Sequence, residues 1–121
     1  MRRAEFEEVV RRAVEALPEE FVARLDNVAI VVEDRPTRDQ LFGGGLDEWE
    51  TLLGLYEGQP LTSREDYGLV PPDKITIFHR PIEAICENVD QIFDEVQATV
   101  VHEIAHHFGI DDHSLEEMGR G

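Results

Sequence analysis

The sequence of 121 residues contains a single cysteine, few cations and no long apolar run. Because Cys86 stands alone, the chain cannot form an internal disulfide or a cysteine-based zinc site. Only 11 Lys and Arg residues accompany 27 Asp and Glu, which gives a formal net charge of -16. This excess of negative charge repels a phosphate backbone and an anionic lipid surface, so we expect neither a nucleic-acid partner nor a membrane partner.

No segment approaches the roughly 18 consecutive apolar residues that a membrane span requires. The N-terminal segment alternates charged and apolar residues and has no continuous apolar stretch typical of a signal peptide. We therefore expect a cytoplasmic protein. Hydrophobic residues make up 41% of the chain, and this content and length predict a single domain over residues 1–121 with its own buried core.

The first half of the chain predicts a helix followed by a strand. Apolar residues at helical spacing form one stripe that ends before Pro18, namely Phe6, Val9, Val10, Ala13, Val14 and Leu17. Residues 18–25 are consistent with a further short helical turn. The β-branched run Val28–Val32 predicts a strand. Residues 34–50 contain a proline and three successive glycines, which is typical of a loop.

The second half predicts two more strands and a long helix. We expect strands at residues 51–58 and 74–78, a helical turn within residues 82–89, and a helix from about Asp90 to His107 that ends at Gly109. A short helix capped by Ser114 is expected after it. The strand at residues 74–78 is either an exposed edge that aligns a peptide or an ordinary core strand. Together the elements predict an α+β fold, with a three-stranded or slightly larger sheet packed against the N-terminal and long C-terminal helices.

One motif carries a specific chemistry, the segment H-E-x-x-H that begins at His102. His102 and His106 are four residues apart on the predicted helix, so both imidazoles project from the same face and can bind one Zn²⁺. Glu103 is rotated by about 100° around the helix, where a carboxylate can reach a water on the metal without being a ligand itself. The motif therefore predicts a zinc site with Glu103 as the general base.

A catalytic zinc site needs a third protein ligand and keeps its fourth position for water. The motif continues as x-x-G-x-x-D, and Gly109 allows the chain to leave the helix sharply and return Asp112 to the metal. We expect His102, His106 and Asp112 to hold one zinc ion per chain. His113 and Asp111 are the alternatives for the third ligand, whereas His107 is expected to pack beside the site rather than bind the metal.

The chain resembles a family of small bacterial zincin-like metallopeptidases, the minimal zincins, which share the Asp-zincin motif. The resemblance rests on GLYEG at residues 54–58, PPDKITIFHRPIE at residues 71–83 and HEIAHHFGIDD at residues 102–112. It implies an α+β fold with the motif helix packed on a small sheet. It also implies zinc ligands at His102, His106 and Asp112, with Glu103 as the general base.

The function expected from these residues is zinc-dependent hydrolysis of a peptide bond in a peptide or protein substrate. The alternative is a zinc-stabilised domain that binds a partner protein and has little or no activity. The residue that stabilises the oxyanion is not assigned by the sequence, and the candidates are Tyr56, Tyr67, His79, Arg80 and His113. The sequence also leaves the oligomeric state open.

Overall fold

The computed structural model describes residues 1–42, 52–58 and 72–109 of the chain. In order along the chain, its elements are α1 (Arg3–Glu15), α2 (Glu19–Ala23), β1 (Val28–Glu33), α3 (Arg38–Phe42), β2 (Gly54–Glu57), β3 (Asp73–Phe78), α5 (His79–Ile85) and α6 (Val89–Phe108). None of the helices in these segments is long and apolar enough to cross a membrane.

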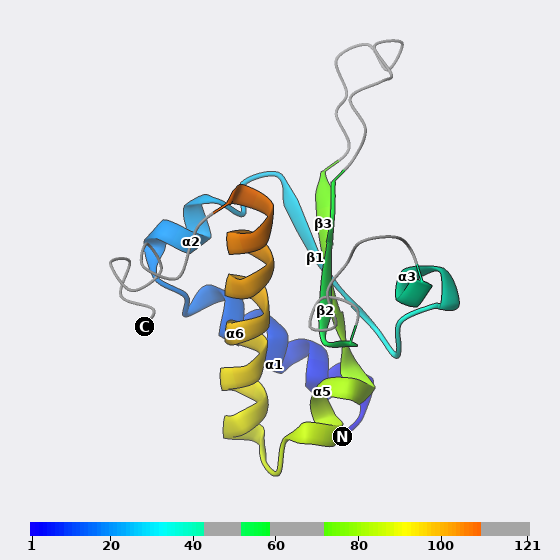
Figure 1. The fold of residues 1–121 in the computed structure, drawn as a ribbon. Coiled ribbons are helices and arrows are strands. Elements are labelled where there is room, and N and C mark those ends of the chain that lie inside the picture. The colour runs from blue at the N-terminus through cyan, green and yellow to red at the C-terminus, as the bar shows by residue number, and fades with distance from the viewer. Residues whose placement is uncertain (43–51, 59–71, 110–121) are drawn as a thin grey trace.

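The three strands form one mixed sheet in the order β1-β3-β2 (Figure 1). β3 runs parallel to β1, with Ile75 opposite Ile30, and antiparallel to β2, with Ile75 opposite Tyr56. The sheet and its helices confirm the expected α+β fold. The strand at residues 74–78 is a core strand, because β3 pairs on both sides, so the prediction that it could be an exposed edge is wrong.

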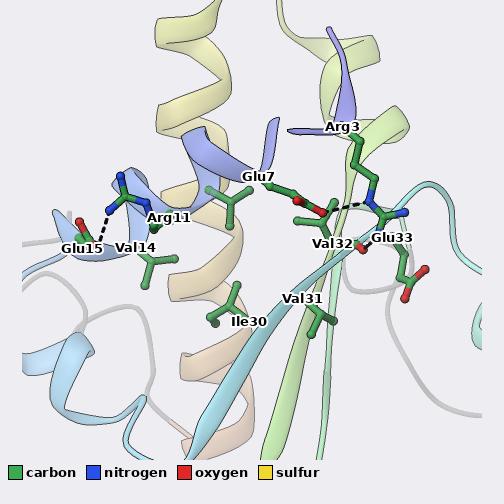
Figure 2. Close-up of a pocket in the computed structure, with 10 residues that line it drawn as sticks. Arg3, Glu7, Arg11, Val14, Glu15, Ile30, Val31, Val32 and Glu33 are labelled. Atoms are coloured by element: carbon green, nitrogen blue, oxygen red, sulfur yellow. Dashed lines mark hydrogen bonds and ion pairs between the residues drawn. The ribbon is translucent and has the colours of Figure 1, made fainter. Parts of the chain in front are cut away.

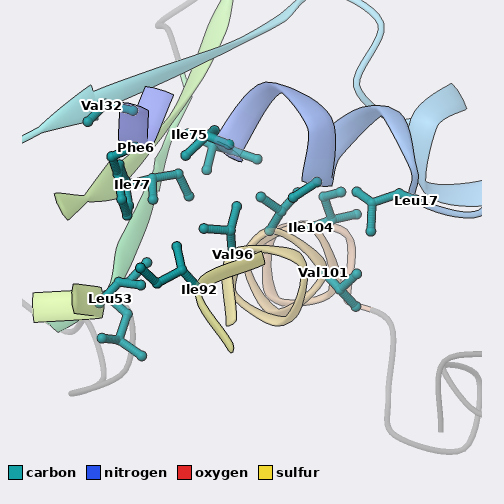
Figure 3. Close-up of a cluster of buried hydrophobic side chains, with 14 of the residues drawn as sticks. Phe6, Leu17, Val32, Leu53, Ile75, Ile77, Ile92, Val96, Val101 and Ile104 are labelled. Carbon is teal, nitrogen blue, oxygen red and sulfur yellow. The ribbon is translucent and has the colours of Figure 1, made fainter. Parts of the chain in front are cut away.

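The hydrophobic core lies between one face of the sheet and the helices α1 and α6. Ile75 and Ile77 of β3 are fully buried and face α6, while Phe6 of α1 fills the space beside them (Figure 3). The stripe of α6 that packs on this core is apolar at helical spacing and consists of Ile92, Val96, Val100 and Ile104. Burial of this stripe against Ile75 and Ile77 holds α6 against the sheet and so fixes the direction of its C-terminal end.

The long helix α6 begins and ends where its capping residues require. The side chain of Asn88 accepts a hydrogen bond from Gln91 N at 2.9 Å and caps the N-terminus. Gly109 has a φ of 70°, a left-handed conformation that a glycine adopts without strain, and it ends the helix. The predicted helix from about Asp90 to His107 is therefore confirmed to within one residue at each end.

Other predicted boundaries agree less closely. β2 covers only residues 54–57 of the strand expected at residues 51–58, and α5 begins earlier than the expected helical turn. α3 lies inside the segment predicted as a loop. Its start carries a reciprocal cap, in which Gln40 N donates to Thr37 Oγ1 and Thr37 N donates to Gln40 Oε1. The helix expected after Gly109 lies outside the described residues.

Strand β2 comes unusually close to α6 at Gly54. A Cβ added to Gly54 would lie 2.5 Å from Thr99 Cγ2 of α6 and 3.2 Å from the Thr76 carbonyl oxygen of β3. A side chain therefore has no room at this position, and the absence of one lets the β2 backbone approach the helix.

We expect Gly54→Ala to destabilise the fold by about 1–3 kcal/mol, because the new methyl group overlaps Thr99. Urea denaturation measures this change. Gly58→Ala is the matched control, since its Cβ would meet its nearest neighbour, Asp73 Oδ1, at an ordinary 3.7 Å. Adding Thr99→Ser to Gly54→Ala removes the overlapping methyl group and should restore part of the loss. Equal effects of the two alanine variants would contradict the close approach.

Candidate metal centre

The last two turns of α6 carry the three residues of the H-E-x-x-H motif and the histidine that follows it, namely His102, Glu103, His106 and His107. This end of α6 lies beside β2, whereas the N-terminal end lies beside α5 (Figure 1). The chain leaves the helix at Gly109, directly after this cluster. The motif is thus located at the C-terminal end of a helix whose apolar stripe packs on the core.

His102 and His106 project from the same side of α6. Their ring centroids are 6.4 Å apart and their planes are tilted by 35°; His102 is half-buried and His106 is exposed. Two imidazoles that share a tetrahedral zinc, each with a bond of about 2.0–2.1 Å, have centroids about 5 Å apart. Small side-chain rotations bridge this difference, so the pair fits a zinc ion as two nitrogen ligands.

Glu103 points in a different direction from the two histidines, toward the sheet. Its side chain is fully buried, and its Oε1 accepts a hydrogen bond from the backbone N–H of Tyr56 at 2.8 Å. A buried carboxylate is costly unless a donor satisfies it, and here the donor is a backbone group of β2. The strand therefore fixes the orientation of Glu103 next to His102.

Tyr56 connects β2 to the remaining polar groups near this end of α6. Its ring stacks on His107 with centroids 3.9 Å apart and an interplanar angle of 14°. Its hydroxyl donates to Asp73 Oδ2 at 2.6 Å. Burial, reinforced by this hydrogen bond and the charge of Asp73, raises the pKa of Tyr56 above its ordinary value, so the hydroxyl stays protonated as a donor.

His107 lies beside the histidine pair but faces Tyr56 and Gly58, whose added Cβ would be 3.8 Å from His107 Cε1. Its ring also packs edge-on against Phe108, with centroids 4.9 Å apart. His107 thus packs against β2 instead of pointing with His102 and His106, in keeping with the role expected for it.

The structure separates the candidates for oxyanion stabilisation. Tyr56 lies beside the motif, but its hydroxyl donates to Asp73. His79 is fully buried in α5, where its ring stacks on Phe6 at 4.4 Å, and it lies with Arg80 at the opposite end of α6. Those two residues are therefore too far from the motif to act there. Tyr67 and His113 lie outside the described residues.

The third ligand also lies outside the described part of the chain. This holds for Asp112 and for its alternatives Asp111 and His113. Among residues 1–42, 52–58 and 72–109, no group of three or more His, Cys, Asp or Glu side chains is arranged to hold a metal ion. The described residues thus supply the histidine pair and the carboxylate of Glu103, and the completion of the site stays a prediction.

Sequence reasoning missed the contribution of β2. Neither the Tyr56 backbone donor nor the close approach at Gly54 was expected, although GLYEG was singled out as a segment. A glycine at the start of a short strand was the available signal, because glycine in a strand often marks a close backbone approach.

Residues 25–121 match the family of zincin-like metallopeptidases. The chain therefore belongs to the zincin-like metallopeptidase family. No curated protein matches it.

Among solved structures, the chain is similar to a conserved hypothetical protein from Thermus thermophilus, with 24% sequence identity and a TM-score of 0.52. The match covers 98% of each chain. At this level of identity the similarity shows a shared fold only.

We expect His106→Ala to weaken zinc binding by at least about a hundredfold, because it would remove one of the two nitrogen ligands predicted on α6. His107→Ala is the matched control on the next residue of the same helix. It should change zinc affinity by less than about tenfold, which is the smallest loss expected when a residue that supports a metal ligand is removed. Competition with a chromophoric chelator measures both affinities. A loss in His107→Ala as large as that in His106→Ala would contradict the assignment.

Proposed function

We propose that the protein is a zinc-dependent peptidase in which His102, His106 and Asp112 hold one zinc ion and Glu103 is the general base. The observation that carries the proposal is the geometry of α6. Two imidazoles share one side of the helix, and the carboxylate between them in sequence is held in place by a backbone hydrogen bond at 2.8 Å. Membership of the zincin-like metallopeptidase family supports the same chemistry.

A zinc ion at these ligands would supply Lewis acidity, which polarises the scissile carbonyl and lowers the pKa of the attacking water. Glu103 would remove the proton from that water. Tyr56 N would hold the carboxylate at Oε1 while Glu103 takes this proton and passes it to the leaving amine. The fixed orientation of Glu103 means that it need not reorient during proton transfer.

The chemistry of the substrate follows from the charge of the chain. With 27 acidic residues and a net charge of -16, the surface attracts cations over a distance comparable to the Debye length. We therefore propose a peptide or protein substrate that carries basic residues near the cleaved bond. Association with such substrates should weaken as ionic strength rises.

One observation favours a second candidate function, a zinc-stabilised domain that binds a partner protein without cleaving it. Glu103 has no exposed surface, and a carboxylate that only braces β2 against α6 would have the same hydrogen bond to Tyr56 N. The two functions differ in whether Glu103 acts on a proton or only accepts a hydrogen bond.

Glu103→Gln separates them. The amide oxygen of glutamine can still accept from Tyr56 N, so the fold and the bound zinc should persist, while hydrolysis should fall by about 10²–10⁴-fold because the base is lost. Mass spectrometry of a mixture of synthetic basic peptides measures cleavage, and elemental analysis measures zinc.

Glu57→Gln is the matched control, since it makes the same change on β2 at a half-exposed side chain 3.5 Å from Lys74 Nζ. It should leave both cleavage and zinc content within about twofold, as surface changes of this kind are energetically small. Cleavage by Glu103→Gln at the wild-type rate would contradict the proposed mechanism. Zinc-loaded wild-type protein that cleaves none of the peptides would favour the binding domain.

A further inference from the structure

A surface depression lies between α1 and β1, away from the motif end of α6 (Figure 2). It has a volume of about 630 Å³. Valine and isoleucine side chains from both elements form its apolar lining, and a row of charged residues borders it along α1. Since β1 and β2 are the two outer strands, this groove and the candidate metal centre lie at opposite edges of the sheet.

The backbone of β1 presents hydrogen-bonding groups to this groove. Phe78 N donates to Leu53 O, so Phe78 directs its backbone N–H and C=O groups toward β2. Neighbouring residues of a strand direct these groups to opposite sides, so Ile75 and Ile77 direct theirs toward β1. By the same alternation, Val28, Ile30 and Val32 direct their N–H and C=O groups outward. A contact from the Arg3 guanidinium to the Val32 carbonyl oxygen agrees with this direction.

Two of these outward groups already have partners. Val28 N donates to Leu25 O at 2.9 Å, and Val32 O accepts from Arg3. In an antiparallel pairing of two β1 strands about a twofold axis at Ile30, Val28 N of one strand would face Val32 O of the other. The two groups that already have partners would therefore face each other across the axis, so neither leaves a group of the second copy unpaired that lacks a partner of its own. The remaining groups complement one another, because Ile30 pairs with Ile30 of the second copy, and Val32 N faces Val28 O of the second copy.

The sequence of β1 itself lacks the residues that usually protect an edge strand from pairing. Its sequence, VAIVVE, has no proline, no lysine and no bulge, and its only charged residue is Glu33 at one end. An aliphatic edge of this kind readily pairs with another strand unless something covers it.

The charges along α1 are self-complementary under the same axis. Arg3, Glu7, Arg11 and Glu15 border the groove at successive turns of the helix. A twofold axis perpendicular to the sheet makes two α1 helices antiparallel, which places Arg3 opposite Glu15 and Glu7 opposite Arg11 of the second copy. Residues 1–17 contain four arginines and four glutamates, so this face is neutral in a chain of net charge -16.

We propose that the groove is a twofold interface between two copies of this chain. β1 pairs antiparallel with β1 of the second copy, which joins the two three-stranded sheets into one of six strands. The neutral α1 face lets two strongly acidic chains meet there without facing like charges. Both β2 edges, with their candidate metal centres, remain at the outer ends of the joined sheet.

Sedimentation equilibrium of the full chain tests this interface. Wild-type protein should approach twice its monomer mass of 13.8 kDa as concentration rises. Arg11→Glu places two glutamates opposite each other at both symmetric positions, so the dissociation constant should rise by at least about tenfold. Arg12→Glu makes the same charge change on the neighbouring residue, which does not line the groove, and should leave the dimer intact. Circular dichroism checks that both variants fold.

A mixture of two variants gives a sharper test. Glu7→Arg alone opposes two arginines and should also weaken the dimer. Mixed with Arg11→Glu, it restores opposite charges at both positions, so native mass spectrometry should show the heterodimer in preference to either homodimer. Hydrogen exchange should protect the amides of Ile30 and Val32 in the wild-type dimer and not in Arg11→Glu.

Three results would overturn the proposal. The first is a monomer at every concentration reached. The second is equal weakening by Arg11→Glu and Arg12→Glu, which would locate the contact elsewhere. The third is a dimer in which the amides of Ile30 and Val32 exchange as fast as in the monomer, because those two donors are the core of the proposed strand pairing. None of these measurements depends on zinc or on peptide cleavage.

Discussion

The contact between β2 and α6 is the constraint on which the candidate site depends. Gly54 has no side chain, so the β2 backbone lies close enough to the helix for Tyr56 N to donate to Glu103 Oε1 at 2.8 Å. A carboxylate with no exposed surface is costly to bury unless it accepts hydrogen bonds. The hydrogen bond from Tyr56 N therefore helps to stabilise the buried Glu103 and also orients it beside His102. The fold and the proposed chemistry both depend on this bond.

The sheet separates the two kinds of surface on this chain. β3 lies in the centre and packs Ile75 and Ile77 against the helices, while β1 and β2 are the edges. The β2 edge meets the motif end of α6, and the β1 edge meets the face of α1 on which Arg3 and Arg11 alternate with Glu7 and Glu15. Acidic residues dominate the remaining chain. This charge distribution supports the two proposals, a basic substrate and a contact between two copies at the α1 face.

Features set by neighbouring residues, such as the bounds of α6, could be predicted from the sequence. The features that were missed depend on contacts between residues far apart in the chain. The periodic apolar stripe and Gly109 were enough to define α6, and the spacing of His102 and His106 was enough to place both on one side of it. The Tyr56–Glu103 bond joins residues 47 positions apart, and a backbone donor leaves no trace in sequence. Strand order is equally non-local, which is why β3 was not recognised as central. By contrast, α3 could have been predicted from the reciprocal cap of Thr37 and Gln40.

We propose that Asp112, beyond the end of α6, completes a zinc site with His102 and His106. Native mass spectrometry of the zinc-loaded chain, comparing Asp112→Ala with Asp111→Ala, tests it most directly. We expect one zinc ion in the wild-type protein and in Asp111→Ala, and loss of most of the zinc in Asp112→Ala, because in the proposed site only that variant removes a ligand. Full zinc occupancy in Asp112→Ala, or no zinc in the wild-type protein, would contradict it.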